Sequence, residues 1–204
     1  MLAALCVTTT ALLLNYSGRR QPDRMTRVTL KLANIGYAVP GAVLAVGIFV
    51  SFAWLDRVIP APLRDFLGIA PGALLQGSVM AMLTAYLIRF LAVGFGPLES
   101  AFHRVTRNID EAATALGLGG IRLLYRVHLP MLRGGLATAA VLVFVDVLKE
   151  MPITLMTRPF GWDTLAVRIF ELTSEGQWER AALPALVLVL AGVLPVIQLT
   201  RGSE

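Results

Sequence analysis

Charged side chains are scarce in this sequence. Asp, Glu, Lys and Arg make up 15% of the 204 residues, whereas 56% are hydrophobic, and the mean hydropathy is +0.72. Soluble globular domains average roughly 25% charged and roughly 45–50% apolar residues. The apolar residues also fall in long blocks, as expected for membrane spans and not for one globular core. The composition therefore predicts an all-α protein, a polytopic bundle of transmembrane helices.

Cysteine and histidine are almost absent. The single cysteine, Cys6, excludes an internal disulfide and a cysteine metal cluster. The two histidines, His103 and His128, form no H-E-x-x-H motif, which disfavours a zinc protease. Neither a G-x-S-x-G nucleophile motif nor a G-x-x-x-x-G-K-[ST] phosphate loop occurs. We therefore predict no catalytic residue, no metal and no cofactor in this chain, and we expect His128 to complete the fold of its segment.

Five segments are candidates for membrane spans, each of which needs about 20 mostly apolar residues. They cover 1–17, 35–55, 74–94, 134–156 and 181–200 within a single domain over 1–204. The first is short, so it is either a full span or the remainder of a truncated one. It lacks the Lys or Arg that begins a signal peptide. The third belongs to an uncharged run that starts at Phe66 and stays apolar past Arg89 to Gly94.

The positive charges lie between these apolar runs, so they predict topology and not a nucleic-acid partner, although the net charge is +5. Eleven Lys and Arg residues fall in the segments after spans one, three and five, and five fall in the segments after spans two and four. The richer side is expected to be cytoplasmic. This orientation places the N-terminus outside and residues 95–133 inside.

Small residues recur in the second span. Gly36, Gly41, Ala45 and Gly47 accompany Pro40 there. They fit either close packing between helices in lipid or a kinked helix that lines a pathway.

Residues 95–133 carry a helical pattern of their own. Asn108 can cap a helix start, and Glu111 can cap it in return. Gly117 permits a change of direction, after which 121–127 can form a second short helix. A loop of this length with its own helices is uncommon unless it is functional, although an ordinary connection is the alternative. We predict a helix–turn–helix whose surface inserts into a groove on another protein.

The spacing within this loop resembles the EAA loop of ABC importer permeases. The family motif is E-A-A-x3-G-x9-I-x-L-P, and every spacing agrees, with Val127 in place of Ile. The match is carried by Glu111, Ala112, Ala113, Gly117, Val127, Leu129 and Pro130. The resemblance implies a type I ABC importer permease fold in the bacterial cytoplasmic (inner) membrane. It also implies that the loop docks on a cytoplasmic ATPase.

Further stretches resemble ferric-iron-type permeases. They are 37–41, 89–93 and the run from Val143 to Arg168, and the resemblance extends from about Arg27 to Arg201. Such permeases usually carry two halves in one polypeptide, and this chain resembles the C-terminal half. It is thus a fragment, a split subunit or a half that pairs with another copy.

That resemblance also implies partners and a cargo. The partners are an ATPase dimer that binds ATP and Mg, a second permease half, identical or different, a periplasmic substrate-binding protein, and membrane lipid. Ferric iron is the implied substrate, with thiamine, phosphonate or polyamine as alternatives.

Three charges fall inside the fourth predicted span. Asp146 precedes Lys149 and Glu150 by three and four residues, so the three share one helix face. Charges in lipid are costly and should face protein or water. Either Asp146 neutralises Lys149 and fixes packing, or the carboxylates line a path for a cation such as ferric ion, which prefers oxygen ligands. Lys149 argues against a simple cation site, so we favour the structural or gating role.

Two other groups of charges have two interpretations each. Arg89 is expected to reach the headgroups or an inner-leaflet partner, with a role in transport as the alternative. The outer segment 158–180 carries Asp163, Glu171, Glu175 and Glu179, and it is either a solvated loop or, as the resemblance implies, a docking face for the binding protein. A stand-alone secondary transporter or channel is the alternative from another class, although no inverted repeat is evident. A membrane enzyme would lack a catalytic constellation.

Overall fold

The computed structural model describes residues 1–20, 28, 31, 35–59 and 75–201. These residues form helices joined by turns, with no strand among them, which confirms the predicted all-α class. In chain order the elements are α1 (Leu2–Arg20), α3 (Gly41–Val58), α5 (Val79–Arg104), α6 (Arg107–Ala115), α7 (Ile121–Leu123), a π-helical turn (Leu124–His128), α8 (Leu129–Met131), α9 (Arg133–Leu148), α10 (Pro152–Thr157), α11 (Leu165–Ser174) and α12 (Trp178–Arg201).

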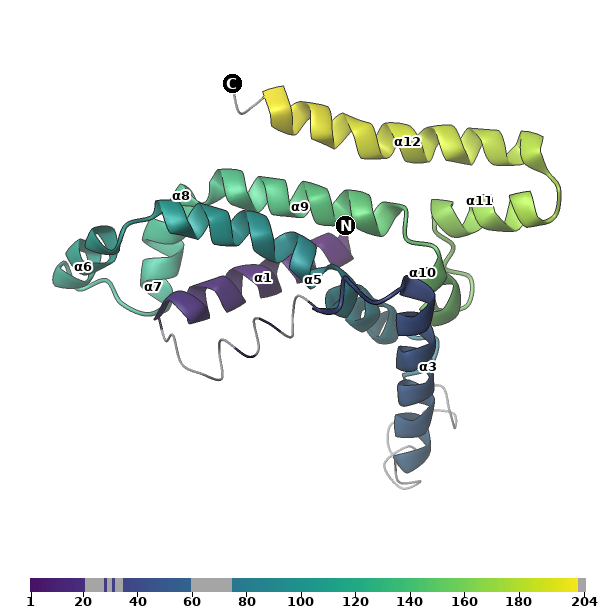
Figure 1. Ribbon diagram of the computed structural model, residues 1–204, viewed down its shortest axis with the longest axis horizontal. Coiled ribbons are helices and arrows are strands. Elements are labelled where there is room, and N and C mark those ends of the chain that lie inside the picture. Colours follow the sequence, from purple (N-terminus) through teal and green to yellow (C-terminus); the bar gives the residue numbers. More distant parts are fainter. Residues whose placement is uncertain (21–27, 29–30, 32–34, 60–74, 202–204) are drawn as a thin grey trace.

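The centre of the molecule consists of α1, α5 and α9, which pack against one another (Figure 1). Apolar side chains of these helices, joined by others from α3, α10 and the π-helical turn, form two buried clusters. One surrounds Leu98 and Leu132, and the other surrounds Phe90 and Ile153. Gly94 lies where all three helices meet, because a Cβ on it would be 3.3 Å from side-chain atoms of both Val7 in α1 and Val143 in α9.

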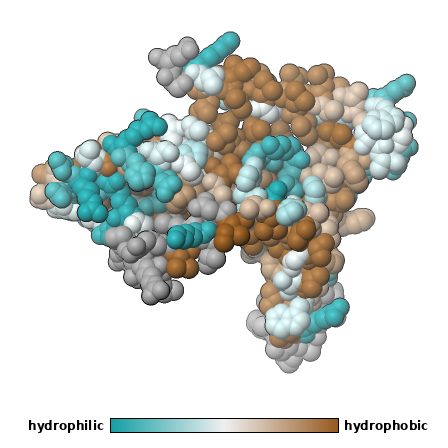
Figure 2. All heavy atoms as spheres, in the orientation of Figure 1, coloured by the Kyte–Doolittle hydropathy of each residue, from teal (hydrophilic) through white to brown (hydrophobic). Residues whose placement is uncertain are grey.

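The remaining helices extend from the two ends of this bundle (Figure 1). Helices α6 and α7 lie at one end, α10 and α11 lie at the other, and α3 projects away from the bundle. Helix α12 returns beside α9. Hydrophilic residues gather over the α6–α7 end of the face in view, and hydrophobic residues cover much of its middle, where they surround a smaller hydrophilic patch (Figure 2). This face therefore has one strongly polar end beside a largely apolar middle.

Three of the described helices are long and apolar enough to cross a membrane, namely α3, α5 and α12. A fourth span results if Ile121–Met131 and α9, which meet at an angle of 81°, are counted as one. Helix α1 does not meet this criterion, so the first predicted span, 1–17, stays a prediction together with the total of five.

Several helix bounds differ from those predicted. Helix α5 continues to Arg104 because Phe95, Leu98 and Phe102 recur at helical spacing and are buried, so 95–104 do not belong to a loop. The segment 134–156 is not one helix: α9 ends at Leu148 and α10 begins at Pro152, whose ring nitrogen carries no N–H to continue a helix.

The other predicted spans also shift. Within the segment 35–55, helix α3 begins at Gly41, directly after Pro40. Within 75–94, helix α5 begins after Ser78, which caps it by accepting from the Ala81 N–H. Helix α12 covers the predicted span 181–200 and extends beyond both its ends. Arg24, Arg27 and Arg64, which contributed to the topology prediction, lie outside the described residues, as does the stretch 66–74.

Candidate functional site

The predicted helix–turn–helix is present, and we call residues Arg107–Met131 the EAA-like segment. It begins with α6, reverses direction, and continues through α7, the π-helical turn and α8. The reversal depends on Gly117 and Gly120, whose φ angles of 79° and 56° are in the left-handed region that favours glycine. The second predicted helix, 121–127, is realised as one α-helical turn followed by the π-helical turn.

The predicted reciprocal cap at Asn108 and Glu111 is wrong. Helix α6 begins at Arg107, its N-cap is Thr106, and no side chain caps it. The last carbonyl before the helix, that of Thr106, instead accepts a hydrogen bond from Arg19 of α1. A tertiary contact with a distant segment is therefore found at this helix start, where the predicted local cap is absent.

The residues of the family motif lie mostly at the surface of the segment. Glu111, Ala112, Gly117 and Pro130 are exposed, Val127 and Leu129 are half-buried, and Ala113 is buried. Large apolar side chains accompany them at the surface, since Leu116 is 82% exposed, Ile121 59% and Tyr125 62%. Apolar groups left in water at the polar end of a protein are typical of a surface that binds another protein.

Arg19 holds the inner side of the EAA-like segment. Its Nε lies 2.8 Å from Asp110 Oδ2, and its Nη1 and Nη2 donate to the carbonyls of Phe102 and Thr106 at 2.9 and 3.2 Å. The Tyr16 hydroxyl, one turn earlier in α1, donates to the Gly120 carbonyl at 2.6 Å. The end of α1 therefore contacts both the start of α6 and the turn after it.

His128 completes this interior. Its side chain is 1% exposed and its ring packs edge-on against Tyr16, with centroids 5.5 Å apart, and at the same distance from Phe102. Its Nε2 lies 3.0 Å from Asp110 Oδ1, although this contact is not aligned as a hydrogen bond, and Nδ1 has no partner in the described part of the chain. Burial is the main cause that lowers the pKa of His128 below its ordinary value, and Arg19 adds to it, whereas Asp110 opposes it.

The charges of the fourth predicted span lie at the far end of α9 from this segment. Lys149 Nζ is 2.7 Å from Asp146 Oδ1, so the expected ion pair is formed. Glu150 follows the end of α9, and its Oε1 accepts from the Ile153 N–H in the first turn of α10 at 3.2 Å. The same oxygen would be 3.0 Å from a Cβ on Gly41, where α3 begins. These contacts place Glu150 at a junction of three helices.

A buried chain of hydroxyls supports that junction. The Tyr86 hydroxyl of α5 hydrogen-bonds the Thr154 hydroxyl, which donates to the Glu150 carbonyl at 2.6 Å.

Gly36 packs so closely on α5 that a Cβ there would overlap the Ile88 carbonyl, whereas a Cβ on Gly47 would have nothing within 4 Å. Arg89 of α5 contacts Tyr37, the residue after Gly36. Its Nη1 donates to the Tyr37 carbonyl at 3.3 Å, and its guanidinium lies 5.5 Å from the centre of the Tyr37 ring.

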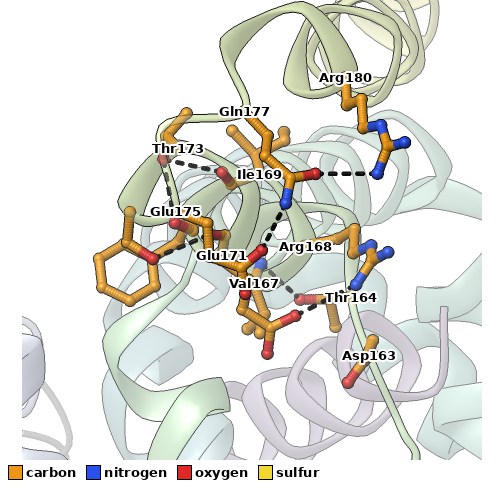
Figure 3. Close-up of polar contacts among 12 residues, drawn as sticks. Asp163, Thr164, Val167, Arg168, Ile169, Glu171, Thr173, Glu175, Gln177 and Arg180 are labelled. Atoms are coloured by element: carbon orange, nitrogen blue, oxygen red, sulfur yellow. Dashed lines mark hydrogen bonds and ion pairs between the residues drawn. The ribbon is translucent and has the colours of Figure 1, made fainter.

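The end of the molecule around α10 and α11 carries a second polar cluster. Arg158 pairs with Asp163 and, at 2.8 Å, with Glu171. Figure 3 shows Glu171 beside Arg168, and Gln177 between Glu175 and Arg180. A groove of about 550 Å³ adjoins this cluster and is lined in part by Phe49, Gln76 and Phe160.

Sequence reasoning missed three residues that these sites depend on. Asp56 is 2% exposed and accepts from the backbone N–H groups of Leu75 and Gln76, which joins the end of α3 to the start of α5. In the sequence, the only sign of Asp56 is that it is a single carboxylate directly after the apolar run 35–55. Arg19 and Asp110 carried no separable signal, because each lies among other charges of its kind in the sequence.

Comparison with known proteins relates the chain to transport permeases. The chain is 27% identical over all 204 residues to a putative 2-aminoethylphosphonate transport system permease protein, PhnV, of Salmonella typhimurium, of which it covers 69%. It is 26% identical over 201 residues to the Fe(3+)-transport system permease protein FbpB 2 of Haemophilus influenzae, of which it covers 36%. These likenesses bear out the ABC importer permease indicated by the EAA-like segment. Because the family model of the binding-protein-dependent transport system inner membrane component matches residues 8–201, the chain belongs to that family.

Proposed function

We propose that this chain is the membrane-spanning permease subunit of an ATP-driven importer and that its EAA-like segment docks on a cytoplasmic ATPase. The observation that carries the proposal is the exposed surface formed by Glu111, Ala112 and the apolar side chains of Leu116, Ile121 and Tyr125. This surface belongs to a helix pair held rigidly from beneath by Arg19 and Tyr16. A short helix with small residues fits a groove on a partner.

Two solutes are candidates for the cargo. Ferric ion is favoured by the resemblance of 143–168 to ferric-iron-type permeases and by the Haemophilus relative. A phosphonate such as 2-aminoethylphosphonate is favoured by the Salmonella relatives, because the match covers a larger share of their length. We propose that a periplasmic binding protein delivers the solute to the end of the chain that carries Arg158, Asp163 and Glu171.

The second permease half has a candidate contact surface on α12. The most apolar 18-residue stretch of this helix has a mean hydropathy of 2.4, yet none of it is buried within the chain. Leu183, Leu186 and Leu194 are each more than half exposed. We propose that this surface meets lipid and the second half, which completes the translocation path.

A pair of glycines provides a sharp test of docking. Neither Gly117 nor Gly119 has an atom within 4 Å of an added Cβ, but only Gly117 has a φ angle in the left-handed region. Replacing Gly117 with alanine should strain the turn by about 1–2 kcal/mol, whereas the same change at Gly119 is free of that strain. We expect Gly117→Ala, and also Glu111→Lys, to lose copurification with the partner ATPase in detergent.

The control for this experiment is Gly119→Ala, which should retain the ATPase. Equal ATPase binding by all variants, with unchanged ATP-dependent uptake, would refute the docking role of the segment. The cargo is tested separately, by measuring ATP hydrolysis in proteoliposomes with the cognate binding protein loaded with ferric ion or with 2-aminoethylphosphonate. Stimulation by only one of the two solutes would identify it, and stimulation by neither would reject both.

A further inference from the structure

The guanidinium of Arg19 connects three parts of the chain that are distant in sequence from α1. Its acceptors are the Asp110 carboxylate in α6, the Phe102 carbonyl near the end of α5 and the Thr106 carbonyl before α6. The Arg19 side chain is 17% exposed and that of Asp110 is 24% exposed, so the ion pair is largely shielded from solvent. Ion pairs shielded in this way are screened less by salt than exposed ones.

The chemistry of this contact requires arginine. A guanidinium presents several N–H groups in a fixed plane, so it can serve a carboxylate and two carbonyls at the same time. The Phe102 carbonyl lies in the last turn of α5, where a positive charge is favourable. The Thr106 carbonyl precedes α6, and there the Asp110 carboxylate in the first turn of α6 pairs with the guanidinium. A lysine ammonium on a flexible stem would not reproduce this geometry.

A second contact fixes the other side of the EAA-like segment. The Tyr16 hydroxyl donates to the Gly120 carbonyl, and the Tyr16 ring packs against buried His128. His128 in turn lies 3.0 Å from the Asp110 carboxylate. Helix α1 itself packs along α5 and α9 in the body of the bundle. One face of α1 therefore bridges the segment and the helices that would line a path through the membrane.

We propose that Arg19, Asp110 and Tyr16 form a mechanical joint through which α1 and the EAA-like segment move as one body. This inference rests on the proposed ATPase docking. When the ATPase displaces the segment, the joint transmits the displacement to α1, and the packing of α1 on α5 and α9 carries it into the bundle. Arg19 and Asp110 are positioning residues in this account, because neither belongs to the exposed docking surface.

The test compares Arg19→Gln, Asp110→Asn and the double variant in proteoliposomes with the ATPase, the second half and the binding protein. The measured quantity is solute taken up per ATP hydrolysed. We expect the ATPase still to copurify with each variant and the ratio to fall about tenfold, within the range typical of coupling between sites. Because the pair acts as a unit, the double variant should be no worse than either single one.

Arg104→Gln is the matched control. Arg104 is the last residue of α5, is exposed, and makes no hydrogen bond or ion pair among the described residues. A ratio for Arg19→Gln equal to that of Arg104→Gln would overturn the joint. If Arg19→Gln does not fold, Tyr16→Phe carries the test, because it removes only the hydroxyl that donates to Gly120, and wild-type coupling in that variant would overturn the proposal. Failure of the wild-type chain to bind the ATPase would instead refute the proposed function.

Discussion

Single glycines decide how closely α5 and α9 approach. A Cβ on Gly135 would be 2.5 Å from the Ala101 Cβ and 3.2 Å from the Pro97 carbonyl oxygen, whereas one on the neighbouring Gly134 would meet nothing within 4 Å. Both glycines lie in α9, where alanine is favoured over glycine by about 1 kcal/mol. We expect Gly134→Ala to leave the free energy of unfolding in detergent unchanged or to raise it. Gly135→Ala should lower that free energy by about 1–3 kcal/mol, because the added methyl group overpacks the contact with α5. Equal unfolding temperatures for the two variants would show that the helices separate freely here.

His128 predicts a pH dependence of stability. Its pKa in the folded chain lies below the ordinary value of about 6.5, so between these two pKa values the unfolded chain binds the proton and the folded chain does not. Stability should therefore fall as the pH is lowered through and below about 6.5. The groups facing the ring are Asp110 of α6 and Arg19 and Tyr16 of α1. Thermal unfolding of His128→Gln should lose this pH slope, whereas the exposed His103→Gln should keep it.

At the scale of elements, substitutions of Glu150 at the α9–α10 junction can distinguish a structural role of this residue from a role in transport. Its carboxylate accepts from the Ile153 N–H in the first turn of α10, as a helix cap does, and it also lies against the start of α3. Glutamine keeps an oxygen acceptor and alanine does not, so Glu150→Ala should cost about 1 kcal/mol of stability and Glu150→Gln much less. If Glu150→Gln abolished uptake as completely as Glu150→Ala while both variants stayed folded, the negative charge itself would be needed and the cap would not explain the residue.

The helices and their breaks differ in how well the sequence predicts them. Apolar runs locate α3, α5 and α12, and the motif spacing locates the turn at Gly117, because both signals are local. The start of α6 was predicted wrongly because the side-chain cap at Asn108 and Glu111 does not form. The contact found there is a hydrogen bond from Arg19, about ninety residues away, which no local pattern encodes. The end of α9 was missed although Pro152 is a local signal of a helix break. The contacts of Glu150 with α10 and the packing of α3 against α10, which complete the junction, have no local pattern.

The whole molecule has charges at both ends that agree with one orientation. Arg19 and Arg20 end α1, and Arg19 lies beside the EAA-like segment, so these two arginines share an end of the molecule with those of α6 and α7. Arg158 and Arg168 lie at the opposite end, near α10 and α11, and there they are paired with carboxylates. Among the described residues, Arg104, Arg107, Arg122 and Arg126 make no ion pair, so positive charge is in excess at the α6–α7 end. The distribution of basic residues predicts this end to be cytoplasmic.

Cysteine accessibility tests this orientation directly. The single cysteine, Cys6, can be replaced by serine to give a cysteine-free chain, into which Leu116→Cys or Phe160→Cys is introduced. Both parent side chains are exposed, at 82% and 105%, and they lie at opposite ends of the molecule. We expect a membrane-impermeant maleimide to label Phe160→Cys in intact cells with the outer membrane permeabilised, and to label Leu116→Cys only after the inner membrane is opened. Labelling of Leu116→Cys from the periplasm would place the EAA-like segment on the side where no ATPase can reach it, and both the docking and the joint would then be excluded.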